Sequence, residues 1–193
     1  MQTPSHVAIS LLVWRKVPNW KCALAVVFGA LLPDLAVFVF YGFQKMIGSA
    51  EADIWGSYYF LDHWQFVFDL FNSIPVFLVV AVICHRRGYR IGFLIAASAI
   101  VHVLCDLPLH NDDAHRHFLP FTNWRFISPV SYWDPKHFGV YAMITELLIA
   151  VSACICVVVG KNSKSIKVAG WVTLSIYFAG MAMAVWLWSQ WRG

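Results

Sequence analysis

Long apolar stretches with almost no charged residue recur along the chain, and they constrain its fold more than any other feature. The hydrocarbon core of a bilayer is about 30 Å thick, and a helix of about 20 residues crosses it. In lipid every backbone polar group must find its partner within the protein, so such segments are expected to be helices. Of the 193 residues, 60% are hydrophobic and 12% are charged, which is about half the charged share of a soluble domain. The sequence therefore predicts an all-α, polytopic membrane bundle.

Five stretches are long enough to span a bilayer, and a sixth is too short to do so alone. The short one, residues 5–14, is expected to be a half-helix or re-entrant element buried against the spans. It lacks the basic segment and cleavage site of a signal peptide, so we expect it to be retained. No repeat or linker divides the chain, and we expect one integral membrane domain over residues 1–193. The expected spans are 22–43, 66–84, 91–108, 138–159 and 168–189, and the expected long outer loop is 109–137.

Basic residues gather in three of the connections between these stretches. By the positive-inside rule the three connections are cytoplasmic, which places loop 109–137 on the periplasmic side of a bacterial inner (cytoplasmic) membrane. The net charge of +4 is modest, and no dense basic stripe suggests nucleic acid as a partner. Membrane lipid is the expected partner. The three clusters are Arg15, Lys16 and Lys21; Arg86, Arg87 and Arg90; and Lys161, Lys164 and Lys167.

Ionisable side chains interrupt four of the spans. A charge near the bilayer centre costs about 2.5–3.5 kcal/mol on insertion scales, so such residues usually mark functional sites. At a rise of about 1.5 Å per residue they reach similar depths, in the outer half of the membrane. His102 and Asp106 are four residues apart and share one helix face, and Asp69 and Asn72 are three apart and do likewise. The polar residues at this level are His6, Asp34, Asp69, Asn72, His102, Asp106 and Glu146.

This polar layer has two interpretations. Any one of these side chains can simply hydrogen-bond a neighbouring helix. Several carboxylates at one level, however, would repel one another and stay costly to desolvate without a cation or protons. Mixed His and carboxylate ligands suit Zn²⁺, with Mn²⁺ and Fe²⁺ as alternatives. The sequence therefore predicts a site for a divalent metal or for protons.

The loop 109–137 follows Asp106 directly and carries more acidic and histidine side chains. A solvated polar connection is the simpler interpretation. A connection of this length without an obvious helix is uncommon unless it has a task, so a lid or substrate-binding loop is the alternative. The expected substrate-binding residues are Asn72, Asp112, Asp113, His115 and His117.

Several motifs resemble one known family. The start TPSH, the segment GALLPDL and the H-x3-D ending of a membrane helix resemble the YdjM-like family of LexA-binding, inner-membrane proteins, which is described as a family of metal-dependent hydrolases. The resemblance runs from His6 to about Glu146. It implies that His6, Asp34, His102 and Asp106 are metal ligands.

The outer loop resembles one subgroup of this family, whereas another segment lacks one of the family's motifs. The run DLPLHNDDAHRHFLPFTNWRFISPVSYWD is similar to a bacterial subgroup, some of whose members are labelled as cobalamin biosynthesis proteins, although no residue here supports corrin chemistry. The family's HRGxTHS-like motif is absent where this chain reads LDHWQFVFDLFNS. His63 and Asn72, with Asp69, are the candidates for its place.

These observations lead to one functional hypothesis and two alternatives. The first is a membrane-embedded, metal-dependent hydrolase acting on a lipid-like ester or phosphoester near the outer leaflet. Its general base would be Glu146 or Asp69, and His110 would assist the leaving group. The alternatives are a small proton- or ion-coupled transporter and a non-catalytic membrane subunit whose polar layer locks helices together. Whether the chain is an enzyme stays open at this point.

Overall fold

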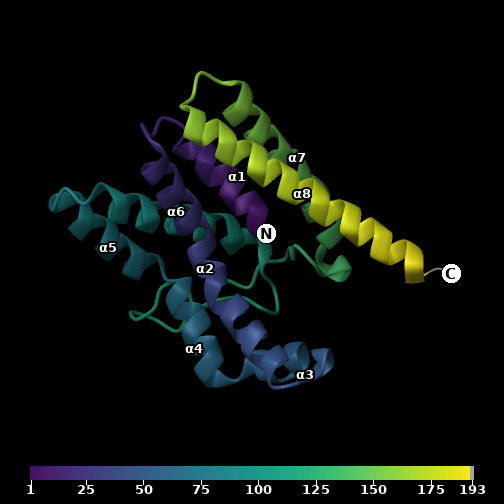
Figure 1. The fold of residues 1–193 in the computed structure, drawn as a ribbon. Helices are drawn as coiled ribbons and strands as arrows, with labels where there is room; N and C mark the ends of the chain where they lie inside the picture. Colours follow the sequence, from purple (N-terminus) through teal and green to yellow (C-terminus); the bar gives the residue numbers. More distant parts are fainter. Residues whose placement is uncertain (192–193) are drawn as a thin grey trace.

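The computed structural model describes residues 1–191, and it confirms the all-α prediction for that part of the chain, which contains helices and no strand. Figure 1 shows the long helices gathered around a short N-terminal one. Three single turns of 3-10 helix join them. The helices are α1 Thr3–Val13, α2 Trp20–Met46, α3 Glu51–Gly56, α4 Asp62–Phe71, α5 Ile74–Arg86, α6 Arg90–Asp106, α7 Gly139–Val159 and α8 Lys164–Trp191, and the 3-10 turns are Tyr58–Phe60, Leu107–Leu109 and Pro135–His137.

Four helical segments of the described chain are long and apolar enough to cross a membrane. They indicate a membrane protein and correspond to four of the five expected spans. The fifth, 168–189, falls within α8, where the side chains of 181 and of 183–193 lie outside the described residues. The four segments are Trp20–Met46, Asp62–Arg86, Arg90–Leu109 and Gly139–Val159.

The second of these segments, Asp62–Arg86, was expected as one span over 66–84, but its helix is interrupted in the middle. Helix α4 ends at Phe71, and α5 begins at Ile74 with a proline in its first turn. The Ser73 hydroxyl accepts a hydrogen bond from the backbone N–H of Val76 and so caps α5. The break lies against the outer loop: Ser73 Oγ donates to the carbonyl of Leu119 at 2.6 Å. Irregular backbone at membrane depth is tolerated where protein covers it in this way.

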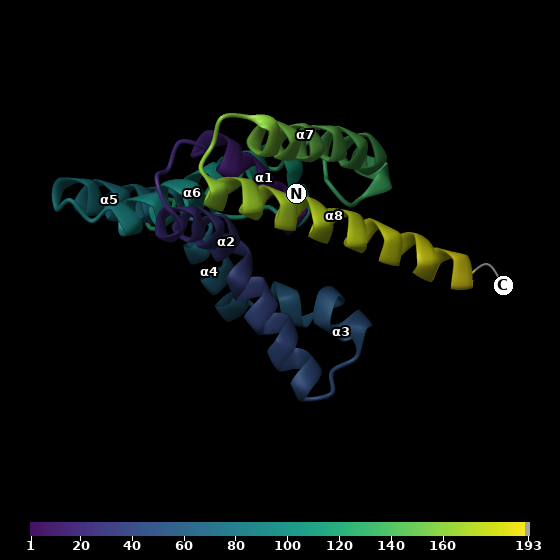
Figure 2. The same cartoon turned by 45° about the horizontal axis from the view of Figure 1, so that its top comes forward.

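The short helix α1 lies inside the bundle, as the sequence predicted for residues 5–14. It contacts α2, α6, α7 and α8, and both views in Figures 1 and 2 show it between α2 and α8. Its buried side chains include His6, Val7 and Leu11. A helix too short to cross the membrane is thus held at mid-bundle, with a histidine facing inward.

Helices α2 and α6 approach each other closely at Gly29. A Cβ atom at this position would lie 2.3 Å from the carbonyl oxygen of Ile95, so a larger residue would force the helices apart. Small residues that let backbones meet are typical of helix contacts in membranes. The contact brings Ala30, the residue after the glycine, next to the face of α6 that carries His102.

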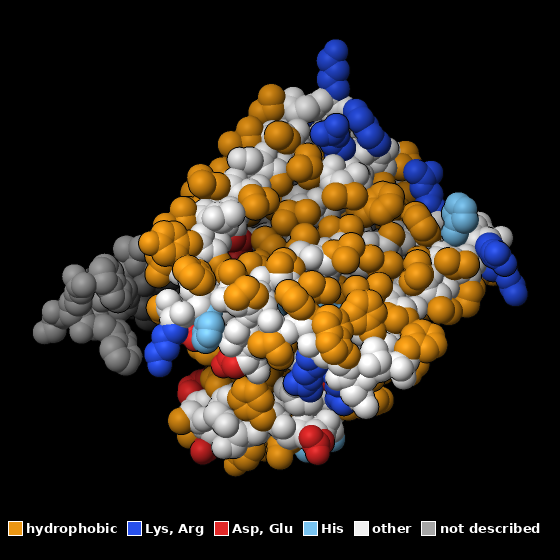
Figure 3. Space-filling view, turned by 180° about the vertical axis from the view of Figure 1, so that it is seen from behind, with side chains coloured by type: hydrophobic (Ala, Val, Ile, Leu, Met, Phe, Trp, Pro, Cys, Tyr) orange, Lys and Arg blue, Asp and Glu red, His pale blue; other side chains and the backbone are white. Residues whose placement is uncertain are grey.

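The outer surface is rich in apolar side chains. Phe38, Leu148 and Val172 are each more than half exposed, and hydrophobic side chains cover most of the face in Figure 3. Lys and Arg side chains lie mainly along its upper and right-hand edges, and acidic ones lie mainly at the lower end. Such a surface fits lipid better than water.

Candidate metal centre

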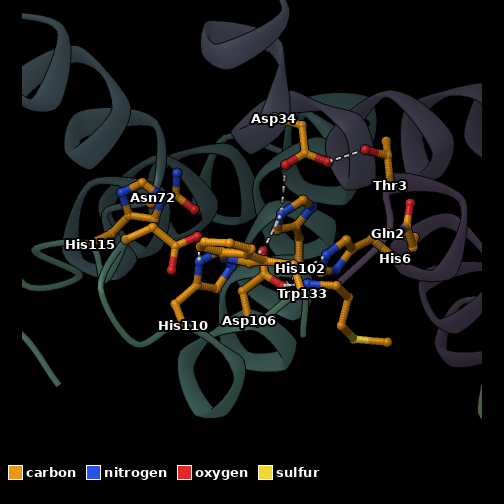
Figure 4. Close-up of polar contacts among 12 residues, drawn as sticks. Gln2, Thr3, His6, Asp34, Asn72, His102, Asp106, His110, His115 and Trp133 are labelled. Carbon is orange, nitrogen blue, oxygen red and sulfur yellow. Dashed lines mark hydrogen bonds and ion pairs between the residues drawn. The ribbon is translucent and has the colours of Figure 1, made fainter. Parts of the chain in front are cut away.

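The carboxylate of Asp106, at the end of α6, is the meeting point of the buried polar layer. His102 lies one turn before it on the same helix, and its Nε2 is 3.1 Å from Asp106 Oδ2. His6, from α1, brings its Nε2 to 3.1 Å from the other oxygen, Oδ1. All three side chains are buried, and Figure 4 shows them converging from two helices.

The orientation of His102 is fixed from behind by a backbone carbonyl. Its Nδ1 lies 2.6 Å from the carbonyl oxygen of Ala30. A carbonyl only accepts hydrogen bonds, so Nδ1 carries a proton, and in a neutral ring Nε2 then carries a lone pair. That lone pair faces the oxygens of Asp106. Two acceptors at this distance repel each other unless a cation or a second proton lies between them.

The histidine contacts with Asp106 are close without being aligned as hydrogen bonds, whereas the amino group of Met1 donates to Oδ1. Among the described residues, Nε2 of His6, Nε2 of His102 and both ring nitrogens of His110 have no hydrogen-bond partner. Such unpaired buried atoms are rare, and they are typical of sites that bind an ion or an ordered water. The His6 and His102 rings are stacked, with centroids 3.5 Å apart and planes 9° from parallel. The stacked rings present their Nε2 atoms side by side, one to each oxygen of the Asp106 carboxylate.

This geometry fits a divalent metal. One ligand atom from each of His6, His102 and Asp106 lies within 4.8 Å of the other two. Ligands in a tetrahedral zinc site, at about 2.0–2.1 Å from the ion, lie about 3.3 Å from one another. Each histidine Nε2 lies 3.1 Å from its nearer oxygen of Asp106, which is close to that value. The buried cluster could hold a metal ion, as expected for these three residues.

Asp34, the fourth expected ligand, lies at the edge of the cluster on α2. Its Oδ1 is 3.5 Å from His102 Nε2, while its Oδ2 accepts a 2.6 Å hydrogen bond from the hydroxyl of Thr3. The side chain is 23% exposed, so it borders the cavity rather than the core. The amino group of Met1 also contacts the Asp106 carboxylate.

On the other side of Asp106, His110 joins the cluster to the outer loop. Its Nε2 lies 3.5 Å from Asp106 Oδ2, and its Nδ1 lies 2.8 Å from Asp113. Burial lowers the pKa of His110, but the two carboxylates outweigh it and raise the pKa to about 9. By contrast, burial lowers the pKa of His117 to about 4, and its Nδ1 lies 3.2 Å from the carbonyl oxygen of Asn72.

A cavity of about 510 Å³ opens in front of this cluster. Its floor includes Asp34 and Asp106, and its walls come from α1, α2, α3, the 3-10 turn Tyr58–Phe60 and the outer loop. Four of the five expected substrate-binding residues line it, whereas His117 does not: Asn72, Asp112, Asp113 and His115.

Two of the expected catalytic carboxylates have other partners. Glu146 accepts hydrogen bonds from the backbone N–H of Gln2 and the hydroxyl of Ser5, so it holds the N-terminus of α1, where a negative charge is favourable. Asp69 contacts His115 Nδ1 at 3.2 Å and pairs with the side chain of Arg116. It therefore ties α4 to the outer loop. The structure brings neither into contact with His6 or His102 among the described residues.

Sequence reasoning did not identify several groups that shape the site. Thr3 and the Ala30 carbonyl orient two of the candidate ligands, and Tyr132 and Trp133 line the cavity. Thr3 belongs to the TPSH motif, which was a usable signal. A backbone carbonyl leaves no signal in sequence.

In comparisons with known proteins, no family model, curated protein or solved structure matches the chain. The resemblance to the YdjM-like family therefore stays a prediction.

Proposed function

We propose that this protein is a membrane-embedded, metal-dependent hydrolase that acts on a lipid-like ester or phosphoester. The observation that carries the proposal is the buried cluster of His6, His102 and Asp106 beside a cavity that Asp106 lines. A divalent metal, Zn²⁺ in the first instance, lowers the pKa of a bound water and polarises an ester or phosphoryl oxygen. Three protein ligands with an open side are typical of catalytic zinc sites.

The surrounding residues divide the remaining tasks. Asp34 is the fourth ligand or holds the attacking water, because it faces both His102 and the cavity. His110 is the favoured group for moving a proton, since it lines the cavity and approaches Asp106. Asp113 and His115 bind the polar head of the substrate. Glu146 and Asp69, whose oxygens hold α1 and the outer loop, act as positioning residues.

The proposal also places the protein in a particular membrane and orientation. The basic clusters favour a bacterial inner membrane with these connections in the cytoplasm, so that the cavity opens toward the periplasmic side. The motifs that resemble the YdjM-like family support the same ligand set.

Metal content measured by elemental mass spectrometry on detergent-purified protein tests the proposal. We expect about one equivalent of a transition metal, as one site with three or four ligands would hold. Asp106→Asn and His102→Ala should lose it, and His63→Ala, an exposed histidine outside the cluster, should keep it.

Circular dichroism and gel filtration confirm that each variant is folded, and a screen of lipid esters and phosphoesters then follows. Folded wild-type protein without metal, or both cluster variants with full metal, would overturn the proposal. Metal without hydrolysis of any lipid ester or phosphoester would leave a metal site but reject the hydrolase.

A further inference from the structure

A second, larger hollow runs along the outside of the bundle between α2 and α8. Its volume is about 980 Å³, and α1 lies between the two helices that form its walls, as Figures 1 and 2 show. The α8 wall runs from Lys164 to Ile176, which is about 18 Å of helix. We call this hollow the lateral groove. Its wall on α2 includes Trp20, Ala23, Leu24, Val27, Leu31 and Phe38.

The lateral groove and the cavity over the metal centre meet at one end. Gln2, Thr3 and Phe38 line both of them. Thr3 is also the residue whose hydroxyl holds Asp34. A molecule lying in the groove would therefore end beside the candidate ligands.

The chemistry of the groove walls selects an apolar occupant. Polar side chains lie at its two ends, with Gln2 and Thr3 beside the site and Lys164 and Ser165 at the far end. The exception along the wall, Thr173, donates its hydroxyl to the carbonyl of Ala169 at 2.8 Å. Its hydrogen is thus already used within α8, and the middle of the groove offers only hydrocarbon surface.

The position of the groove favours a lipid chain as its occupant. Leu24 and Phe38 of α2 and Val168 and Val172 of α8 line it and are each more than half exposed, so the groove opens sideways on the apolar surface of the bundle. At the depth of a membrane-spanning helix such a surface meets lipid chains. Along α8 the groove is about 18 Å long, slightly more than half of the about 30 Å hydrocarbon core.

From this continuity, position and length we infer that the lateral groove binds the hydrocarbon chain of a bilayer lipid whose head lies in the site cavity. The inference rests on the proposed function and names its substrate class: a long-chain lipid that reaches the metal centre sideways from the bilayer. The bond to be cleaved is the ester or phosphoester nearest the chain end at Thr3. Water supplies the hydroxyl group to the acyl or phosphoryl product and the proton to the leaving oxygen.

The test uses the full-length protein in vesicles of phosphatidylcholine that carry a diazirine on one acyl chain. After illumination, peptide mapping locates the adducts. We expect adducts at Val168 and Val172 several-fold above those at Leu148, an equally lipid-exposed residue of α7 outside the groove. Val172→Trp, which fills the groove, should abolish this excess, and Leu148→Trp should leave it unchanged.

Metal content, measured on the same samples, separates this inference from the proposed function. Equal labelling of groove and α7 in protein that holds its metal would overturn the groove but leave the metal centre. Excess labelling of the groove in protein without metal would support lipid binding in the groove but contradict the proposed metal-dependent hydrolase. Cross-linking of two chains through a Val172→Cys variant, with little lipid adduct there, would show a second copy in the groove and overturn the inference.

Discussion

Either protons or one ion can remove the repulsion between the histidine nitrogens and the carboxylate of Asp106. The protonation state of each histidine depends on which of the two is present. His102 already donates through Nδ1 to Ala30, so it approaches the carboxylate either as a charged imidazolium or as a neutral ring facing an ion. His6 stacks on it with its own Nε2 at the other oxygen. Two stacked imidazolium rings would repel each other. A charged His102 beside a neutral His6 that donates through Nε2, or an ion bound by both rings and the carboxylate, avoids that repulsion.

The first prediction concerns Thr3, which contacts a candidate ligand without being one. Thr3→Val keeps the shape of the side chain but removes the 2.6 Å hydrogen bond to Asp34, so the carboxylate is no longer held toward His102. Loss of such an orienting partner typically weakens metal binding about 10–100-fold. Isothermal titration of metal into chelator-treated protein measures the change.

Thr3→Ser is the matched control, because it keeps the hydroxyl and should bind metal as the wild type does. Equal affinity in the valine and serine variants would show that the Thr3 hydroxyl does not orient a metal ligand.

At the level of single residues, the sequence predicted which polar side chains lie in the buried layer better than it predicted which of them contact one another. The spacing of His102 and Asp106 placed them on one helix face, and their side chains do lie 3.1 Å apart. Glu146 was predicted at the same depth, yet it holds α1 instead. Depth is one coordinate along the membrane, whereas contact also depends on how each helix is rotated about its own axis. Hydropathy and spacing leave that rotation undetermined when most of the helix is apolar on all sides.

At the level of helices, the predictions succeeded where apolar length decides and failed where local chemistry does. The half-helix at the N-terminus and four of the spans follow from length alone. The break between α4 and α5 does not, because the chain stays apolar on both sides of it. Its causes are the Ser73 cap and the proline after Ile74, together with the hydrogen bond of Ile74 N–H to the His117 carbonyl. Those signals concern two or three residues and are lost in a window of about 20.

The second prediction concerns the approach of α2 to α6. In Gly29→Ala the new methyl group would meet the Ile95 carbonyl at 2.3 Å, so the helices must separate. Overpacking of this kind costs about 1–3 kcal/mol. The shift also moves the Ala30 carbonyl away from His102, so metal binding should weaken in parallel with stability. Thermal unfolding in detergent and metal titration measure the two effects.

Gly42→Ala, on the same helix, provides the control, because nothing lies within 4 Å of its Cβ position. It should be neutral or slightly stabilising, since alanine favours a helix by about 1 kcal/mol over glycine. A Gly29→Ala protein as stable as Gly42→Ala, with unchanged metal affinity, would contradict the close approach.

At the scale of the whole molecule, the polar groups are separated along the bundle. The exposed basic residues of the three clusters lie at the ends of α1, α5 and α7 and at the starts of α2, α6 and α8. The cavity over the metal centre opens instead among the outer loop, α3 and the 3-10 turn Tyr58–Phe60. The lateral groove extends from that cavity along α8 as far as the basic end. A lipid in the groove would therefore lie with its head at the site and its chain toward the basic edge.

The third prediction tests the orientation that this arrangement requires. In a background without the five native cysteines, Thr122→Cys in the outer loop and Lys161→Cys in a basic connection are both exposed positions. If the positive-inside rule holds, a membrane-impermeant maleimide should label Thr122→Cys in intact spheroplasts and Lys161→Cys only after the membrane is permeabilised. The reverse pattern would place the cavity on the cytoplasmic side, where the lipid head would come from the inner leaflet. Labelling of both before permeabilisation would mean that α7, which separates the two positions, does not cross the membrane.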